Sequence, residues 1–181
     1  DAHFFLGYYV RNNWSPAHED PTSITLSQGF DGVERIEVWK LTSTTNNQEA
    51  EVRNAAALVD LGEPPALLDE ADEYADRLPP DPDVDQYDED DLVNLRRTDS
   101  TNSVSGYVES GANLERPLGA QDFESGNFKK LEKGRDYRLD NNLGFLSLNQ
   151  RLRPNEALAV AYRIRVNGEV REVGDFSGDQ G

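Results

Sequence analysis

Alternation of apolar and polar residues is clearest near the C-terminal end of the chain. The apolar positions there are Leu158, Val160, Tyr162, Ile164 and Val166. A period of two is typical of a strand that buries one of its faces. The dipeptide Asn167-Gly168 follows at once and suits the positive φ angles of a two-residue hairpin turn. The pattern therefore predicts a strand over 157–166 that turns back into a second strand over 169–173.

Two shorter segments of the same kind precede this hairpin. Tyr137 and Leu139 alternate with polar residues, and 145–148 forms another short apolar run. The polar stretch 140–142 between them is typical of a turn. Residues 131–176 together predict a β-meander that forms the core sheet.

The first third of the chain predicts further strands. In 33–42, Ile36 and Val38 share one face while Trp39 shares the other with Leu41, so this strand is expected in the interior of a sheet. The apolar run 55–61 is expected to pair with it in antiparallel fashion. Residues 3–14 form a dense apolar cluster, for which Gly7 and several β-formers favour a strand over a helix.

The middle of the chain has a different character. Residues 66–78 show the apolar stripe of an amphipathic helix, and Pro79-Pro80 ends it. Residues 98–127 are rich in Ser, Asn, Gly and Asp and predict a long loop, with one minor strand at 107–108. The sequence thus predicts a single domain over 1–181 of mainly β (β-rich α+β) class, with antiparallel sandwich-like sheets, a C-terminal β-meander, one short helix and a long acidic loop excursion over about 79–127.

Charge narrows the range of partners. The formal net charge is −17, which argues against binding to nucleic acid or to an anionic membrane surface. The chain has 14 Arg but 4 Lys, and 19 Asp against 16 Glu. An Asp-rich, Lys-poor surface fits a protein that works in high salt, but also a solvated acidic face on an ordinary extracytoplasmic domain. No apolar run approaches the length of a membrane-spanning helix, so no direct membrane span is expected.

An acidic run raises the question of calcium. Asp81, Asp83 and Asp85 alternate like the opening of a calcium-binding loop, whose carboxylates converge on the cation. An EF-hand loop then needs Gly at its sixth position and Glu at its twelfth, where this chain has Gln86 and Leu92. We therefore interpret the run as a solvated linker rather than a metal site.

Other catalytic or binding signals are weak. His3 and His18 do not occur together with a candidate nucleophile or a set of metal ligands. No Cys, G-x-S-x-G, Walker loop or G-x-G-x-x-G motif occurs in the chain. The chain is therefore not expected to be an enzyme, nor to have catalytic, cofactor-binding or metal-binding residues. Several aromatic residues could stack on sugars, but most lie in apolar patterns that indicate a core role. They are Tyr8, Tyr9, Trp14, Trp39 and Tyr162.

Three blocks of the chain resemble one family. They are HFFLGYYVRNNW, then GVERIEVWKLTS with the later RNAAALVDLGE, and finally RDYRLDNNLGFLSLNQRLRPNEALAVAYRIRVNGEVREVGDFS. In this order they resemble an extramembrane domain of SprA-type cell-surface proteins, the giant outer-membrane proteins of gliding motility and type IX secretion in the Bacteroidetes. The closing block carries the most specific part of the resemblance. Residues 66–127 match poorly, and nothing functional is carried across them.

The resemblance implies a role in protein transport. The whole protein would be an outer-membrane translocon that exports proteins bearing a C-terminal signal, and this chain would be one soluble domain of it at the cell surface, on the extracellular rather than the periplasmic side. The domain would be non-catalytic, capping the pore or docking partners, and those partners would be other parts of the parent protein and secretion-system proteins. The alternative is a free-standing surface module that binds glycan or Ca²⁺.

Overall fold

The computed structural model describes residues 2–7, 30–43, 51–58, 123–174 and 176–177, which we call the strand frame. The frame contains eight strands and no helix. The strands are β1 (His3–Phe5), β2 (Phe30–Thr42), β3 (Val52–Leu58), β4 (Phe123–Lys130), β5 (Tyr137–Asp140), β6 (Phe145–Leu148), β7 (Leu158–Val166) and β8 (Glu169–Val173). They form two antiparallel sheets, which confirms the predicted mainly β class. The helix predicted for 66–78 and the minor strand at 107–108 lie outside the described residues.

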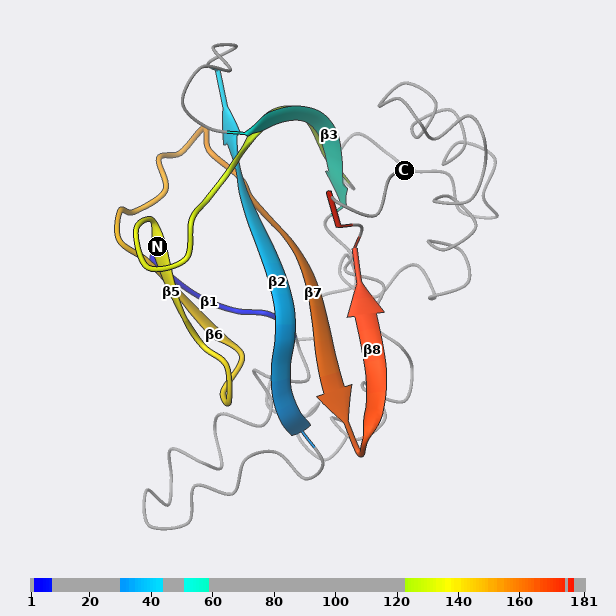
Figure 1. Cartoon of the computed structure of the whole chain (residues 1–181). Helices are drawn as coiled ribbons and strands as arrows, with labels where there is room; N and C mark the ends of the chain where they lie inside the picture. Colours follow the sequence, from blue (N-terminus) through cyan, green and yellow to red (C-terminus); the bar gives the residue numbers. More distant parts are fainter. Residues whose placement is uncertain (1, 8–29, 44–50, 59–122, 175, 178–181) are drawn as a thin grey trace, which may run out of the picture.

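The larger sheet is built on one long strand pair. Its order is β3-β4-β2-β7-β8, so β2 lies inside the sheet as predicted. Ile36 pairs with Tyr162 and Val38 with Val160, which aligns the apolar faces of β2 and β7. Figure 1 shows β2, β7 and β8 running side by side, while β3 lies where the sheet curls over at one end.

The hairpin of β7 and β8 forms as the sequence predicts. Asn167 has φ 51° and Gly168 has φ 80°, the left-handed values that a tight two-residue turn requires. The turn is also fastened to β2, because the N–H of Gly168 donates to Oδ2 of Asp31 at 3.2 Å. Beside it, the Arg165 guanidinium lies 2.6 Å from the Glu34 carboxylate. The hairpin tip is thus held in place by polar contacts.

The predicted pairing of 55–61 with 33–42 is wrong. β3 pairs with β4, and β4 in turn pairs with β2, so one strand separates the two segments. Residues 123–127, predicted as the end of the acidic loop excursion, belong to β4. The rest of that excursion, 79–122, lies outside the described residues. β4 was not predicted because its sequence FESGNFKK has two exposed polar residues near its start and no apolar alternation.

The predicted C-terminal meander is also corrected. β5 and β6 form a hairpin in a three-stranded sheet with β1, whereas β7 and β8 belong to the five-stranded sheet. The chain passes from one sheet to the other over 149–157. A hydrogen bond from the Glu156 N–H to the Arg153 carbonyl, 3.0 Å long, helps turn it there. Alternation indicates that a strand buries one face but not which sheet it joins. Consecutive strands of two different sheets were therefore predicted as one meander.

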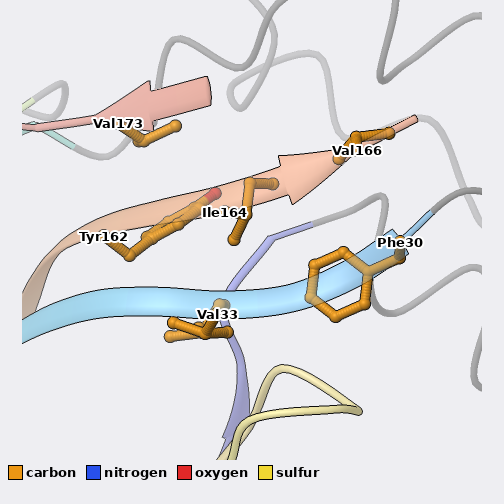
Figure 2. Packing of buried hydrophobic residues seen from close by; sticks show 7 residues of the cluster. Phe30, Val33, Tyr162, Ile164, Val166 and Val173 are labelled. Carbon is orange, nitrogen blue, oxygen red and sulfur yellow. The ribbon is translucent and has the colours of Figure 1, made fainter. Parts of the chain in front are cut away.

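The core lies between the two sheets. Figure 2 shows side chains of β2, β7 and β8 gathered at one end of this core, with Tyr162 and Ile164 each 1% exposed. This cluster contains Leu6, Phe30, Val33, Tyr162, Ile164, Val166 and Val173. A second cluster, Val38, Tyr137, Leu146 and Leu148, joins β2 to the hairpin of β5 and β6. The two-layer packing agrees with a sandwich-like fold.

The tip of the β5–β6 hairpin rests on an irregular part of β2. The backbone carbonyl of Asn141 accepts a hydrogen bond from the N–H of Val33 at 2.9 Å. Gly32 beside it has φ 119°, and a Cβ there would lie 3.2 Å from the same carbonyl oxygen. The pairing of β2 with β7 shifts register at this point. Glycine therefore allows the smaller sheet to approach the larger one closely.

Candidate functional site: a carboxylate network on the polar face

The five-stranded sheet has a second face, opposite the three-stranded sheet, which we call the polar face. Alternation along β2 places Glu37 and Trp39 on this face, because Ile36 and Val38 enter the core. Antiparallel register brings Lys130 of β4 opposite Trp39. Glu37 is 7% exposed and is the one buried charged residue among the described residues. A buried carboxylate requires donors around it.

Two residues supply those donors. Oε1 of Glu37 accepts hydrogen bonds from Lys130 Nζ at 2.9 Å and from Ser177 Oγ at 3.0 Å. Oε2 accepts from the backbone N–H of Ser177 at 2.9 Å. Burial by itself would raise the pKa of Glu37, but these hydrogen bonds and the positive charge of Lys130 outweigh it and hold the pKa below its ordinary value. Glu37 is therefore ionised at neutral pH.

The segment after β8 reaches Glu37 by crossing the sheet. Gly174 has φ 74°, and a Cβ there would lie 3.1 Å from the Cβ of Ala161. Glycine thus both permits the turn and lets the backbone pass close over β7. Beyond it, Phe176 is 1% exposed, and the Arg35 guanidinium lies 3.9 Å from the centre of its ring. This contact is a cation–π interaction on the polar face.

Ser177 is held from a second direction as well. Nη1 of Arg53 on β3 donates to the carbonyl of Ser177 at 2.9 Å, and Lys130 Nζ donates to its hydroxyl at 2.9 Å. Glu51 joins the two cations, with carboxylate oxygens 2.7 Å from Arg53 Nε and 3.5 Å from Lys130 Nζ. We call Glu37, Glu51, Arg53, Lys130 and Ser177 the Glu37 network. It joins three strands to the segment that follows β8.

The contacts of the Glu37 network suit it to holding strands together. A general base needs a pKa near the working pH and a lone pair open to substrate, whereas Glu37 has a lowered pKa and accepts three hydrogen bonds. Lys130 is paired with two carboxylates, those of Glu37 and Glu51. Within the strand frame no group of three or more His, Cys, Asp or Glu side chains is placed to hold a metal ion. The network therefore acts as a clamp.

The residues singled out in the sequence have separate positions. His3 is exposed and stacks on Phe145 with ring centres 5.7 Å apart, as expected of a surface packing residue. Tyr162 is 1% exposed in the core, and Lys130 lies 5.2 Å from the centre of the Trp39 ring. Tyr162 is therefore closed to a ligand, whereas Trp39 is half-buried on the polar face. The others lie outside the described residues: Tyr8, Tyr9, Trp14, His18, Asp81, Asp83 and Asp85.

Sequence reasoning did not single out the Glu37 network. Its members come from β2, β3, β4 and the end of the described chain, and Glu37 is 140 positions from Ser177. One signal was available: a carboxylate in the middle of a strand with apolar residues on both faces is expected to be buried and therefore paired. That signal identifies Glu37 but none of its partners.

A second surface feature is the outer edge of β8. This strand is the last in the five-stranded sheet. Its Val170 is 46% exposed and is the one large apolar residue that is exposed within the strand frame. On either side, the carboxylate of Glu169 and the guanidinium of Arg171 lie 2.6 Å apart. The edge is thus a short stretch of alternating charge around one exposed apolar residue.

Charge divides sharply between the strand frame and the rest of the chain. The frame holds 13 of the 18 lysines and arginines and 11 of the 35 acidic residues, a formal charge of +2. Residues 59–122, which separate β3 from β4, hold 18 acidic and 4 basic residues, a formal charge of −14. Leu58 pairs with Phe123, so this acidic segment leaves and re-enters the sheet at adjacent positions.

No protein-family model matches the chain, and no curated protein matches it. A search of the described residues for a helix long and apolar enough to cross a membrane finds none.

Proposed function

We propose that this chain is a non-catalytic structural and docking domain of a SprA-type outer-membrane translocon. One observation carries the proposal: the blocks that resemble this family contribute most of the strand frame. The first block supplies β1, the second supplies β2 and β3, and the closing block supplies β5 to β8. The blocks meet in space, because β1 pairs with β6 and β2 pairs with β7. The resemblance thus follows a folded unit rather than scattered segments.

The division of charge supports a docking role. The acidic segment 59–122 enters and leaves through the β3–β4 pair, so it can vary in sequence without altering the pairing of the frame. Most of this segment lies within 66–127, the part that resembles the family poorly. We infer that the frame is the common scaffold and that 59–122 is the surface particular to this protein. Partners with a basic surface would be attracted to it.

The state of the ionisable groups supports a non-catalytic role. Arg163 pairs with Glu172 and Lys40 with Glu156, in addition to the pairs of the Glu37 network. A hydrogen bond from the Arg153 N–H, outweighing a small burial effect and aided by Lys40, lowers the pKa of Glu156. Glu37 and Glu156 are thus stabilised in their charged form, which suits them to holding strands together and not to proton transfer near neutral pH.

The proposal is tested by affinity capture with two matched baits. One bait is the whole chain, and the other has Asn-Gly in place of 59–122, which keeps Leu58 opposite Phe123. Both are immobilised and exposed to outer-membrane extract from a gliding bacterium of the Bacteroidetes, and bound proteins are quantified by mass spectrometry. We expect secretion-system proteins on the whole chain and several-fold less on the shortened bait. Equal recovery on both baits and on a blank resin would refute the docking role.

The alternative, a surface module for glycan or Ca²⁺, makes a different prediction. Ligand that binds the folded state raises the melting temperature by mass action. Melting the whole chain with and without millimolar Ca²⁺, and screening it on a glycan array, separates the two functions. A Ca²⁺-dependent rise that disappears in the Asp81→Asn/Asp83→Asn/Asp85→Asn variant would favour the module.

A further inference from the structure

The outer edge of β8 has a defined hydrogen-bonding pattern. Val166 and Glu169 flank the two-residue turn and are paired with each other. In such a hairpin these flanking residues exchange their backbone hydrogen bonds, and bonding then alternates along the strand. The N–H and C=O groups of Val170 and Glu172 therefore point away from β7. The outer edge of β8 thus offers the backbone N–H and C=O groups of these two residues for pairing with a further strand.

We propose that two copies of this chain associate through β8, as antiparallel strands related by a two-fold axis at Val170. In this register Val170 faces Val170 of the second copy, and their outward N–H and C=O groups bond reciprocally. Glu169 of each copy then faces Arg171 of the other, so opposite charges meet twice. Glu172 faces Gly168, which has no side chain to obstruct it. The inference concerns self-association and does not depend on the proposed function.

The charges of β8 select this register over its neighbours. An axis at Arg171 would place two guanidinium groups opposite each other, and an axis at Glu172 would do the same with two carboxylates. Like charges directly opposite each other destabilise a strand pair. Charged residues on an edge strand usually prevent association, but the order Glu-Val-Arg is complementary to itself when inverted about the valine. The exposed valine is then covered in the dimer.

The two-fold arrangement also limits the size of the assembly. An isologous interface uses the same edge on both copies, so pairing β8 with β8 closes the assembly at two. The two five-stranded sheets become one continuous ten-stranded sheet. The hairpin tip is already fastened to β2 before association, because Gly168 is bonded to Asp31 and Arg165 to Glu34. Little ordering of the backbone is therefore needed on binding.

Sedimentation and light scattering of the whole chain over a wide range of concentrations test the proposal. We expect a monomer–dimer equilibrium, and a monomer at every concentration would overturn the inference. Val170→Pro removes an N–H that the hairpin itself does not use, at an edge position where proline is tolerated. We expect this variant to lose the dimer, and a Val170→Pro variant that dimerises like the parent chain would also overturn the inference.

A pair of charge variants tests the register even if the proline variant folds poorly. Glu169→Arg alone and Arg171→Glu alone each place like charges opposite each other in a homodimer, so each is expected to be monomeric. Mixed in equal amounts they should form a heterodimer, because the first variant then presents two guanidinium groups to the two carboxylates of the second. No association in the mixture, when the parent chain dimerises, would refute pairing about Val170.

Discussion

Glu37→Gln is the substitution that most directly tests the Glu37 network. Glutamine keeps the size of the side chain but replaces one acceptor oxygen with an NH₂ donor and removes the charge. Because both carboxylate oxygens receive hydrogen bonds from Lys130 or Ser177, the new NH₂ group must face a donor. Lys130 keeps its hydrogen bond to the Ser177 hydroxyl, at 2.9 Å, and its longer contact with Glu51, at 3.5 Å.

The size of the effect follows from these contacts. A hydrogen bond to a charged group contributes about 1.5–3 kcal/mol, and a buried donor without an acceptor costs about 1–3 kcal/mol. Since Lys130 keeps part of its pairing, we expect a loss of about 3 kcal/mol in the free energy of unfolding. For a chain of this length that corresponds to a fall of about 6–12 °C in melting temperature.

The pH dependence of the loss in unfolding free energy shows whether the loss comes from the ionised carboxylate of Glu37. The pKa of Glu37 in the folded protein lies below its ordinary value of 4.5, which we take for the unfolded chain. Such a group contributes its stabilisation in full above the unfolded pKa and loses it as the pH falls through the folded pKa. The difference in unfolding free energy between the parent chain and Glu37→Gln should therefore be full at pH 7 and shrink steadily below about pH 4.5.

Urea unfolding followed by tryptophan fluorescence, at pH 7 and at several lower values, measures this difference. Titration of the many other acidic residues cancels because the two proteins are compared at the same pH. Glu169→Gln is the control: its side chain is 67% exposed, so the change in the monomer should stay within about 0.5 kcal/mol. Equal stability of Glu37→Gln and the parent chain at pH 7, or a difference independent of pH, would refute the role assigned to Glu37.

Three other changes test the packing of the strand frame. Gly174→Ala should destabilise by about 2–4 kcal/mol, against about 1 kcal/mol for Gly168→Ala, because only the first would bring a Cβ against β7; equal melting temperatures would contradict this. Ile164→Ala, in the core, should cost about 2–5 kcal/mol and the exposed Val170→Ala at most about 0.5 kcal/mol in the monomer, as measured by denaturant unfolding. Replacing 59–122 by Asn-Gly should leave the strand content in circular dichroism unchanged and stabilise the frame by up to about 3 kcal/mol through loop closure; loss of the cooperative transition would show that 59–122 is part of the core.

The sequence predicts the strands whose side chains alternate strictly between core and surface. β7 is the clearest case, since Tyr162 and Ile164 enter the core while Arg163 between them pairs with Glu172. The hairpin after it was equally predictable, because Asn167-Gly168 is suited to the conformation that the turn adopts. In these segments local preference and tertiary packing agree.

β4 shows where this reasoning fails. Only Phe128 of this strand is fully buried. Leu41 of β2 packs over Gly126, where an added Cβ would lie 2.9 Å from a methyl group of that leucine. A glycine in a polar stretch predicts a loop, yet here it leaves room for a side chain of the neighbouring strand. Its role is fixed by the long-range pairing with β2 and β3, which no local pattern contains.

The partners of Glu37 could not be predicted from the sequence for a related reason. The burial of Glu37 depends on Lys130 and Ser177, which lie 93 and 140 positions away in the sequence. Alternation correctly places Glu37 beside Trp39 on the second face of β2, but whether that face meets solvent or a returning segment is decided by Gly174 and Phe176. Such contacts become visible only once the topology is known.

The pairing of β2 with β7 has a consequence for synthesis of the chain. The two strands are brought together from far apart, as Glu34 and Arg165 show with 131 positions between them. During translation β2 emerges long before β7, so Ile36 and Val38 have no β7 partner until β7 itself has left the ribosome. The local β7–β8 hairpin can form early, whereas closing so long a loop is slow. The nascent chain should therefore need a holding chaperone on β2 until β7 and β8 are made.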